Sequence, residues 1–142
     1  AGTVPDMLLI YNGQEVSWNK RLKFFEKDSI NWVDTSDFIP FYTLLIDLKH
    51  RNKALWNGEA GGDMVRVNTA HDEDVYAFYR ESQGDLVFVV LNLSDNERTI
   101  KVEEEKLYGN YIETFSRLIK TFDSNNDTIN LEPWEYLVFE KK

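Results

Sequence analysis

The feature that most constrains the fold is a change in residue pattern close to Asn57. Before it lie one apolar run, an irregular loop and one amphipathic segment, whereas after it short apolar segments alternate with turn residues. Short strands separated by turns every 8 to 12 residues or so are typical of an antiparallel sandwich. We therefore expect two units, a strand-loop-helix unit over residues 1–57 and a β-sandwich over residues 58–142.

The strands expected in the second unit are short and follow from alternating or continuous apolar residues: 64–67, 75–80, 86–91, 99–103, 111–115, 128–131 and 135–139. In the fourth of them, Ile100 and Val102 are expected to face inward. Residues 81–85, which include Gly84, predict a five-residue hairpin loop.

The first unit opens with five consecutive apolar residues, 7–11, which predict a strand buried on both faces, as in a parallel sheet. Residues 17–34 show no clear period and predict an ordered loop held by aromatic side chains. A cluster of N-capping residues, Asp34-Thr35-Ser36-Asp37, then predicts a helix that ends near Arg51. Its apolar stripe is wide, so we expect the helix to pack on more than one side.

Length and charge exclude several classes of protein. The chain has 142 residues, which suits one ordinary domain and is too short for a complete (β/α)8 barrel of roughly 200 residues or more. Its net charge of -9 disfavours nucleic acid and anionic membranes as partners. With no cysteine, disulfides, thiolate metal sites and cysteine nucleophiles are excluded. The chain begins without an initiator Met, which indicates a processed product or an excised segment.

Residues 5–15, Pro-Asp-Met-Leu-Leu-Ile-Tyr-Asn-Gly-Gln-Glu, resemble the stretch around the eighth barrel strand of the α-amylase family (glycoside hydrolase family 13), where the pattern is roughly P-G-M-P-L-I-Y-x-G-Q-E. Asp6 and Leu8 stand where the family usually has Gly and Pro, so the backbone entering this strand is expected to differ. Later blocks, in the same order as in the family, resemble the loop after that strand, the eighth helix, a hallmark strand and turn of domain C, and its closing strand: residues 20–32, 41–58, 87–94 and 131–136.

The resemblance implies a C-terminal fragment: the last strand and helix of a barrel, followed by the Greek-key β-sandwich called domain C. The family's catalytic Asp, Glu and Asp lie at the ends of the fourth, fifth and seventh barrel strands, all before residue 1. Retaining glycoside hydrolysis needs two carboxyl groups about 5 Å apart across the scissile bond. We therefore expect no catalytic residue, metal or cofactor and no hydrolysis from this chain alone. Its role would be structural, within a parent enzyme that acts on α-glucans.

Two residues are candidates for contact with substrate in the intact enzyme. Gln14 and Glu15 follow the barrel strand at its carboxyl end, which is the rim where substrate binds in such barrels. The alternative is that both side chains hydrogen-bond neighbouring loops. Four tryptophans could stack on sugar rings, which would make the sandwich an independent carbohydrate-binding module, or could anchor the core and the domain junction: Trp18, Trp32, Trp56 and Trp134.

Two acidic segments mimic metal sites. Ala70-His71-Asp72 precedes further acidic residues and is expected to be a turn leading into a strand, with metal binding as the alternative. The segment 123–127 resembles the opening of a calcium loop, but Thr128 and Trp134 occupy the positions that need Gly and Glu, so a solvated turn is favoured.

The main expected partner is the upstream catalytic barrel. Without it, the strand at 7–11 and the helix would leave backbone edges and apolar surface uncovered. We therefore expect the fragment to self-associate through residues 4–48, or residues 1–17 to refold against the sandwich. No feature of the sequence identifies the compartment.

Overall fold

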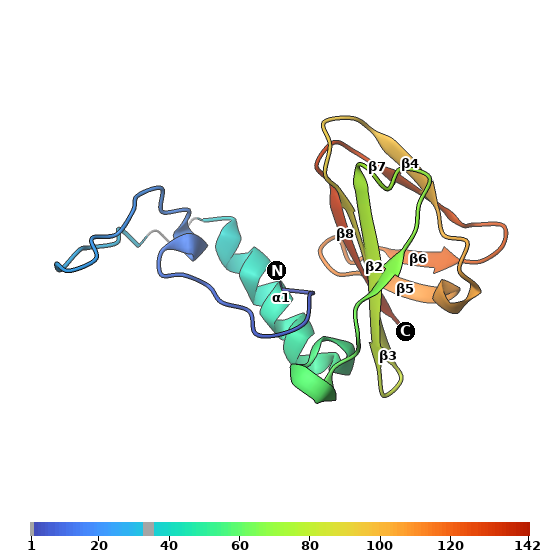
Figure 1. The fold of residues 1–142 in the computed structure, drawn as a ribbon, viewed down its shortest axis with the longest axis horizontal. Helices are drawn as coiled ribbons and strands as arrows, with labels where there is room; N and C mark the ends of the chain where they lie inside the picture. The colour runs from blue at the N-terminus through green and yellow to red at the C-terminus, as the bar shows by residue number, and fades with distance from the viewer. Residues whose placement is uncertain (1, 33–35) are drawn as a thin grey trace.

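Strand β3 (Asp85–Asn92) lies inside a six-stranded antiparallel sheet that dominates the computed structural model (Figure 1). The structure describes residues 2–32 and 36–142. The sheet has the order β1-β2-β3-β8-β5-β6. The other five strands are β1 (Val65–Val67), β2 (Val75–Ser82), β5 (Gly109–Glu113), β6 (Ile119–Phe122) and β8 (Tyr136–Lys141).

Burial along β3 shows that the sheet has an apolar layer on each side. Leu86, Phe88 and Val90 belong to one core cluster, while Val87 and Val89 belong to the other, and all five side chains are at most 2% exposed. Successive side chains of a strand point to opposite faces. A continuous apolar run is therefore what a strand covered on both faces requires.

The first layer is a two-stranded sheet, β4 (Arg98–Lys101) paired with β7 (Thr128–Leu131). Between it and the large sheet lies the main core, which includes Ile100 and Val102, as expected, and a group of packed rings. Phe88 packs against Phe122 and Phe139 with ring centroids 6.0 Å away in both cases. The antiparallel sandwich predicted from the sequence is confirmed.

The second layer is helix α1 (Phe38–Arg51) together with the 3-10 helix η2 (Lys53–Leu55). Leu48 and Leu55, at most 1% exposed, join Phe78, Val87 and Val89 in the second core cluster. In Figure 1, α1 lies beside the sheet, and the loops before it extend away from the sandwich. The helix ends at Arg51, as predicted; Asp34 and Thr35 of the predicted capping cluster lie outside the described residues.

The strand predicted at residues 7–11 does not form. Met7 is 82% and Leu9 is 80% exposed, and these residues pair with no strand of the described chain. A parallel barrel strand needs a hydrogen-bonded neighbour on each edge, and here neither neighbour is present. Parts of residues 2–17 still pack on the rest of the chain: Gly2 and Thr3 are buried, Arg80 of β2 donates to the carbonyls of Thr3 and Val4, and the turn with the buried Val16 contacts α1 rather than the sandwich.

One further expectation needs correction. The β2–β3 hairpin has a two-residue turn rather than a five-residue loop, because Ser82 pairs with Asp85, and Gln83 and Gly84 both have positive φ, 51° and 89°. This is the conformation that tight hairpins favour. Strand β6 was not predicted.

No helix within residues 2–32 and 36–142 is long and apolar enough to cross a membrane.

Candidate functional site

The two candidate substrate contacts lie together on one tight turn. Gln14 and Glu15 belong to the 3-10 helix η1 (Gln14–Val16). The Gln14 Oε1 atom accepts a hydrogen bond from the Tyr11 amide (3.2 Å), and the Glu15 Oε2 atom accepts one from the Gly13 amide (3.0 Å). Both side chains therefore fold back on their own turn and not onto a neighbouring loop.

Gly13 is the residue that allows this turn. Its φ is 94°, in the left-handed region that glycine tolerates, and a Cβ atom there would lie 2.9 Å from the Cβ of Trp18. The Trp18 amide donates to the Gly13 carbonyl (2.9 Å), so the backbone of Trp18 closes the turn. The buried Trp18 Nε1 finds no hydrogen-bond partner among the described residues.

The four tryptophans come from separate elements of the fold. Trp56 follows η2 and donates from Nε1 to the His50 carbonyl (3.1 Å), as expected of a residue that anchors a junction. Trp32 precedes α1 and is 56% exposed. Trp134 lies between β7 and β8, is 64% exposed, and has a φ of 60°. Trp134 is the one tryptophan of residues 58–142, and its side chain is accessible to a ligand from solvent.

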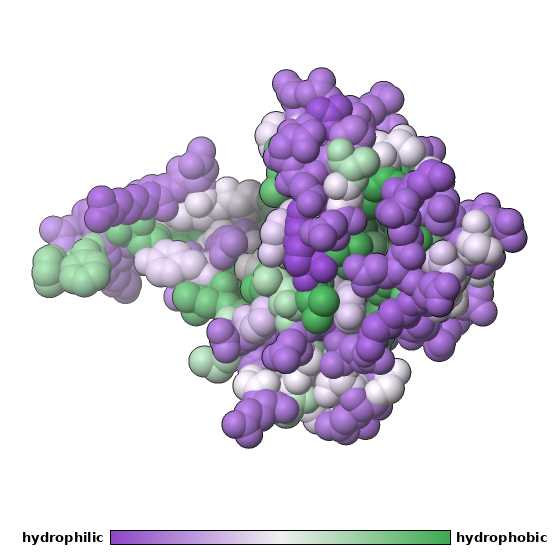
Figure 2. Space-filling view, turned by 45° about the vertical axis from the view of Figure 1, so that its right-hand side comes forward, coloured by the Kyte–Doolittle hydropathy of each residue, from purple (hydrophilic) through white to green (hydrophobic). Residues whose placement is uncertain are grey.

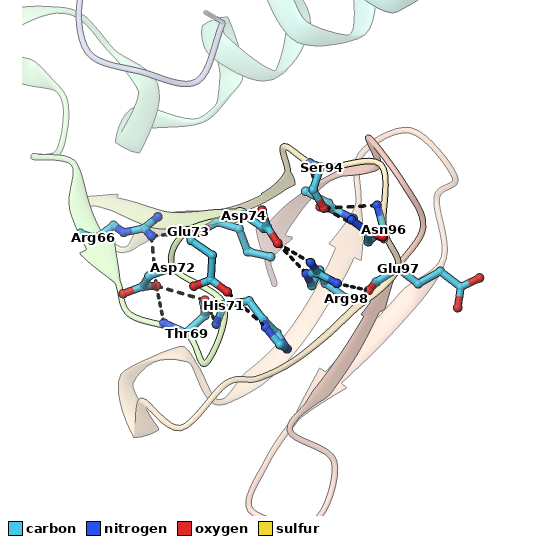
Figure 3. Close-up of polar contacts among 12 residues, drawn as sticks. Arg66, Thr69, His71, Asp72, Glu73, Asp74, Ser94, Asn96, Glu97 and Arg98 are labelled. Carbon is cyan, nitrogen blue, oxygen red and sulfur yellow. Dashed lines mark hydrogen bonds and ion pairs between the residues drawn. The ribbon is translucent and has the colours of Figure 1, made fainter.

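The segment around His71 is a turn stabilised within itself (Figure 3). The Oδ1 atom of Asp72 accepts from the Thr69 amide (2.7 Å) and hydroxyl (3.0 Å) and from Arg66 (3.1 Å). The Thr69 amide is the main cause that lowers the pKa of Asp72. In the described ranges, no group of three or more His, Cys, Asp or Glu side chains is arranged to hold a metal ion. The expected turn is confirmed.

Segment 123–127 is also a turn. The Oδ1 atom of Asp123 accepts from the amides of Asn125 (2.8 Å) and Asn126 (3.0 Å), and residues 123 and 126 form an isolated bridge. Backbone amides thus occupy the carboxylate, as in a solvated Asx turn.

A buried asparagine, Asn92, organises the C-terminal end of β3. The side chain of Asn92, which is 2% exposed, donates to the carbonyls of Asn96 (2.7 Å) and Glu132 (2.8 Å) and accepts from the amide and hydroxyl of Ser94. Beside it, Arg98 pairs with Asp74 (Figure 3). These contacts tie the turn after β3 to the start of β8.

Helix α1 also contacts the sandwich through its side chains, along a seam that runs from Phe41 to Arg51. The ring of Phe41 stacks on Phe115 with centroids 5.2 Å apart and planes 7° apart, and meets Tyr136 edge-on at 5.7 Å. At the other end of the helix, Arg51 pairs with Glu140 of β8, which raises the pKa of Arg51. Aromatic and ionic contacts thus hold both ends of the helix to the sandwich.

Residues 2–32 and 36–57 also present apolar surface that the rest of the described chain does not cover. A groove of about 520 Å³ lies between residues 7–10 and α1, lined in part by Ile46, Lys49 and Trp56. In the loop before α1, Phe24 and Phe25 are 88% and 94% exposed. Figure 2 shows apolar surface at the far end of the region that projects from the sandwich.

Sequence patterning did not identify Arg80, which is 1% exposed at the edge of the seam. The available signal was its position: it continues the phase of Tyr76 and Phe78, which face the helix layer.

A family model and solved structures place these features among known proteins. Residues 75–138 match the model of the C-terminal domain of the α-amylase SusG. A noncanonic maltogenic α-amylase, AmyB from Thermotoga neapolitana, is similar over 98% of this chain and 34% of its own, with a TM-score of 0.80 and 16% identity. An Anoxybacillus α-amylase is similar over 80% of this chain and 24% of its own, with a TM-score of 0.66 and 14% identity.

The enzyme AmyP, solved with maltotriose, shows the same relation, at a TM-score of 0.64 and 15% identity over 80% of this chain and 22% of its own. No curated protein matches the chain by sequence. The chain thus spans about a third or less of each of these enzymes. Over nearly its full length the chain shares the fold of part of one of these α-amylases, and residues 75–138 match the model of an α-amylase C-terminal domain.

Proposed function

We propose that this chain is the C-terminal, structural part of a retaining glycoside hydrolase that acts on α-glucans such as starch and maltooligosaccharides. The observation that carries the proposal is the two-sided environment of α1. One side of the helix shares a core with the sandwich through Leu48, while the other side borders an open apolar groove. A sandwich that covers one side of a helix and leaves the other for further packing suits a domain that stabilises an adjoining catalytic barrel.

The division between the units is proposed at residues 57 and 58. Ala54 and Leu55, just before it, are buried against the sandwich, at most 1% exposed. Asn57 and Gly58 are exposed, and Gly58 has a φ of 58°. In this proposal residues 1–57 close the barrel and residues 58–142 are the complete sandwich.

We also infer that the chain alone is catalytically inert, because the family's catalytic carboxylates would all precede it. Incubation of the pure chain with soluble starch should release no reducing sugar above buffer, with an intact α-amylase at equal molar concentration as the positive control. Turnover that copurifies with the folded chain, and is lost when the chain is unfolded, would overturn this proposal.

A second candidate function is carbohydrate binding by the sandwich itself, which the exposure of Trp134 favours. Titration with maltooligosaccharides would then change tryptophan fluorescence in the wild-type chain and in Trp56→Phe, but not in Trp134→Ala. No change at millimolar ligand in any of the three would leave only the structural role.

The uncovered surface also leads us to propose that the isolated chain self-associates. The exposed apolar residues concentrate in the first unit, and in the intact enzyme the barrel would cover them. In its absence a second copy of the chain can cover the same surface, which large exposed apolar patches favour.

A further inference from the structure

The guanidinium of Arg80 joins three segments that are distant in sequence. From β2 it donates to the carbonyls of Val4 (Nη1, 3.1 Å) and Thr3 (Nη1, 3.4 Å) at the start of the chain. It also donates to Trp56 (Nη2, 3.0 Å) and Gly62 (Nε, 2.8 Å) in the segment that links the units. One side chain thus holds the N-terminal segment and the linker to the sandwich.

This arrangement is unusual for a buried cation, because among the described residues its hydrogen bonds go to backbone carbonyls and none to a carboxylate. Burial lowers the pKa of Arg80, whereas the charges of Asp6 and Asp63 act in the opposite direction. Hydrogen bonds from a charged donor are stronger than neutral ones, and a planar fork can serve several acceptors at once. The three nitrogens of the guanidinium thus reach four carbonyls, which a lysine with a single donor atom cannot match.

Two glycines make room for the contact. A Cβ on Gly61 would lie 2.0 Å from the Trp56 carbonyl oxygen and 2.7 Å from Nη2 of Arg80, and one on Gly62 would lie 2.2 Å from the Glu81 carbonyl oxygen. Because real Cβ atoms do not approach so closely, the linker can reach Arg80 only with glycine at both positions.

The chain then leaves this contact through an unusual turn. Asp6 has a φ of 76°, a left-handed conformation that glycine adopts without strain, and it stands where the resembled family usually has Gly. Its charge acts on both Arg80 and Lys49. After this turn the exposed residues 7–12 lead to the turn that bears Gln14 and Glu15.

We propose that Arg80 is a positioning residue: it anchors residues 2–6 on the sandwich and so fixes the point from which the segment bearing Gln14 and Glu15 departs. In the intact enzyme this would let the sandwich set the placement of a substrate-facing rim. That consequence rests on the proposed function, whereas the anchoring itself does not.

The absence of cysteine makes the anchoring directly measurable. In Val4→Cys, a nitroxide attached at position 4 reports the mobility of the N-terminal segment, because the Val4 side chain is 36% exposed and its carbonyl is unchanged. The label is compared in wild-type, Arg80→Met and Arg66→Met backgrounds. Arg66 is the matched control, since it also donates to two backbone carbonyls, of Val75 and Ala77, but touches no N-terminal residue.

We expect an immobilised label in the wild-type and Arg66→Met backgrounds and a several-fold shorter correlation time in Arg80→Met. Far-UV circular dichroism checks that each variant is folded. Should Arg80→Met not fold, Arg80→Lys carries the test with an intermediate mobility, because lysine offers a single point of donation. A label equally immobile in folded Arg80 variants, or equally mobile in all backgrounds, would overturn the proposal. Neither result would bear on whether the parent enzyme hydrolyses α-glucans.

Discussion

Two continuous apolar runs in this chain have opposite environments. Residues 86–91 lie in β3, between two hydrogen-bonded strands and two apolar layers, and five of the six are at most 2% exposed. Residues 7–11 pair with no strand of the described chain, and Met7, Leu9 and Tyr11 are all more than 60% exposed. The difference lies in the surroundings rather than in the residues. An apolar run indicates that a segment is suited to burial, but it does not indicate which segments cover it.

The largest expected effect is on the free energy of unfolding, which a substitution in the buried run should lower far more than one in the exposed run. Phe88→Ala should lower the free energy of unfolding by about 3–5 kcal/mol, because it removes a ring that is 0% exposed and packed against two others. The matched change Leu9→Ala, at 80% exposure, should alter it by no more than about 0.5 kcal/mol. Urea denaturation followed by circular dichroism, at protein concentrations low enough to keep the chain monomeric, measures both. Similar losses for the two variants would mean that residues 7–11 are buried in solution.

The second effect tests whether α1 belongs to the sandwich energetically. Leu48→Ala should cost about 2–5 kcal/mol, because the side chain is fully buried in the core cluster shared with β3. Ile39→Ala, on the same helix but 37% exposed, serves as the control and should cost much less. If the two substitutions cost the same, the seam seen in the structure does not contribute to folding.

A third effect concerns self-association through the exposed apolar residues 7–11. Met7→Asp with Leu9→Asp should weaken self-association of the chain at least tenfold, or about 1.4 kcal/mol, as measured by sedimentation equilibrium. Leu93→Asp changes an apolar residue of the sandwich that is 57% exposed, and should leave the association constant unchanged. A wild-type chain that stays monomeric at high concentration would contradict the proposal.

The smallest effect is local to the loop before α1. The Lys20 ammonium (2.9 Å) and the amides of Ser29 and Lys23 lower the pKa of Asp28 to about 2. Because the folded-state pKa lies below the unfolded one, the contribution of these contacts is complete above the unfolded pKa and is lost as the pH falls toward about 2. Carboxyl NMR titration should show the pKa of Asp28 rising in Lys20→Met. An unchanged pKa would show that the pair does not form in solution.

Much of the sandwich could be predicted because its strands follow simple patterns. The strand at 128–131 has the predicted bounds, and the inward phase of Ile100 and Val102 is confirmed. Strand β6 escaped prediction because its four residues are mostly polar or exposed, with Ile119 68% exposed, and because it follows a residue with positive φ, Arg117. The prediction of a strand at 7–11 was wrong because periodicity carries no information about whether neighbouring strands are available to pair with it.

The site was predictable only where a local motif carried it. The motif around Gly13 located Gln14 and Glu15 on one turn, but not the direction of their hydrogen bonds. Arg80 could be assigned to a face of β2, yet its acceptors come from residues 3, 4, 56 and 62. Such a convergence depends on the tertiary fold, and nothing in the strand around Arg80 encodes it.

The alternation of β3 between two layers has a consequence for how substitutions combine. Phe88 and Val89 are joined by a peptide bond, but their side chains lie in different core clusters, so the energetic effects of replacing them should add. Phe88 and Phe139 are far apart in sequence, but their rings are stacked with centroids 6.0 Å apart, so their effects should be coupled. Along this strand, energetic coupling follows the faces of the sheet and not the order of the chain.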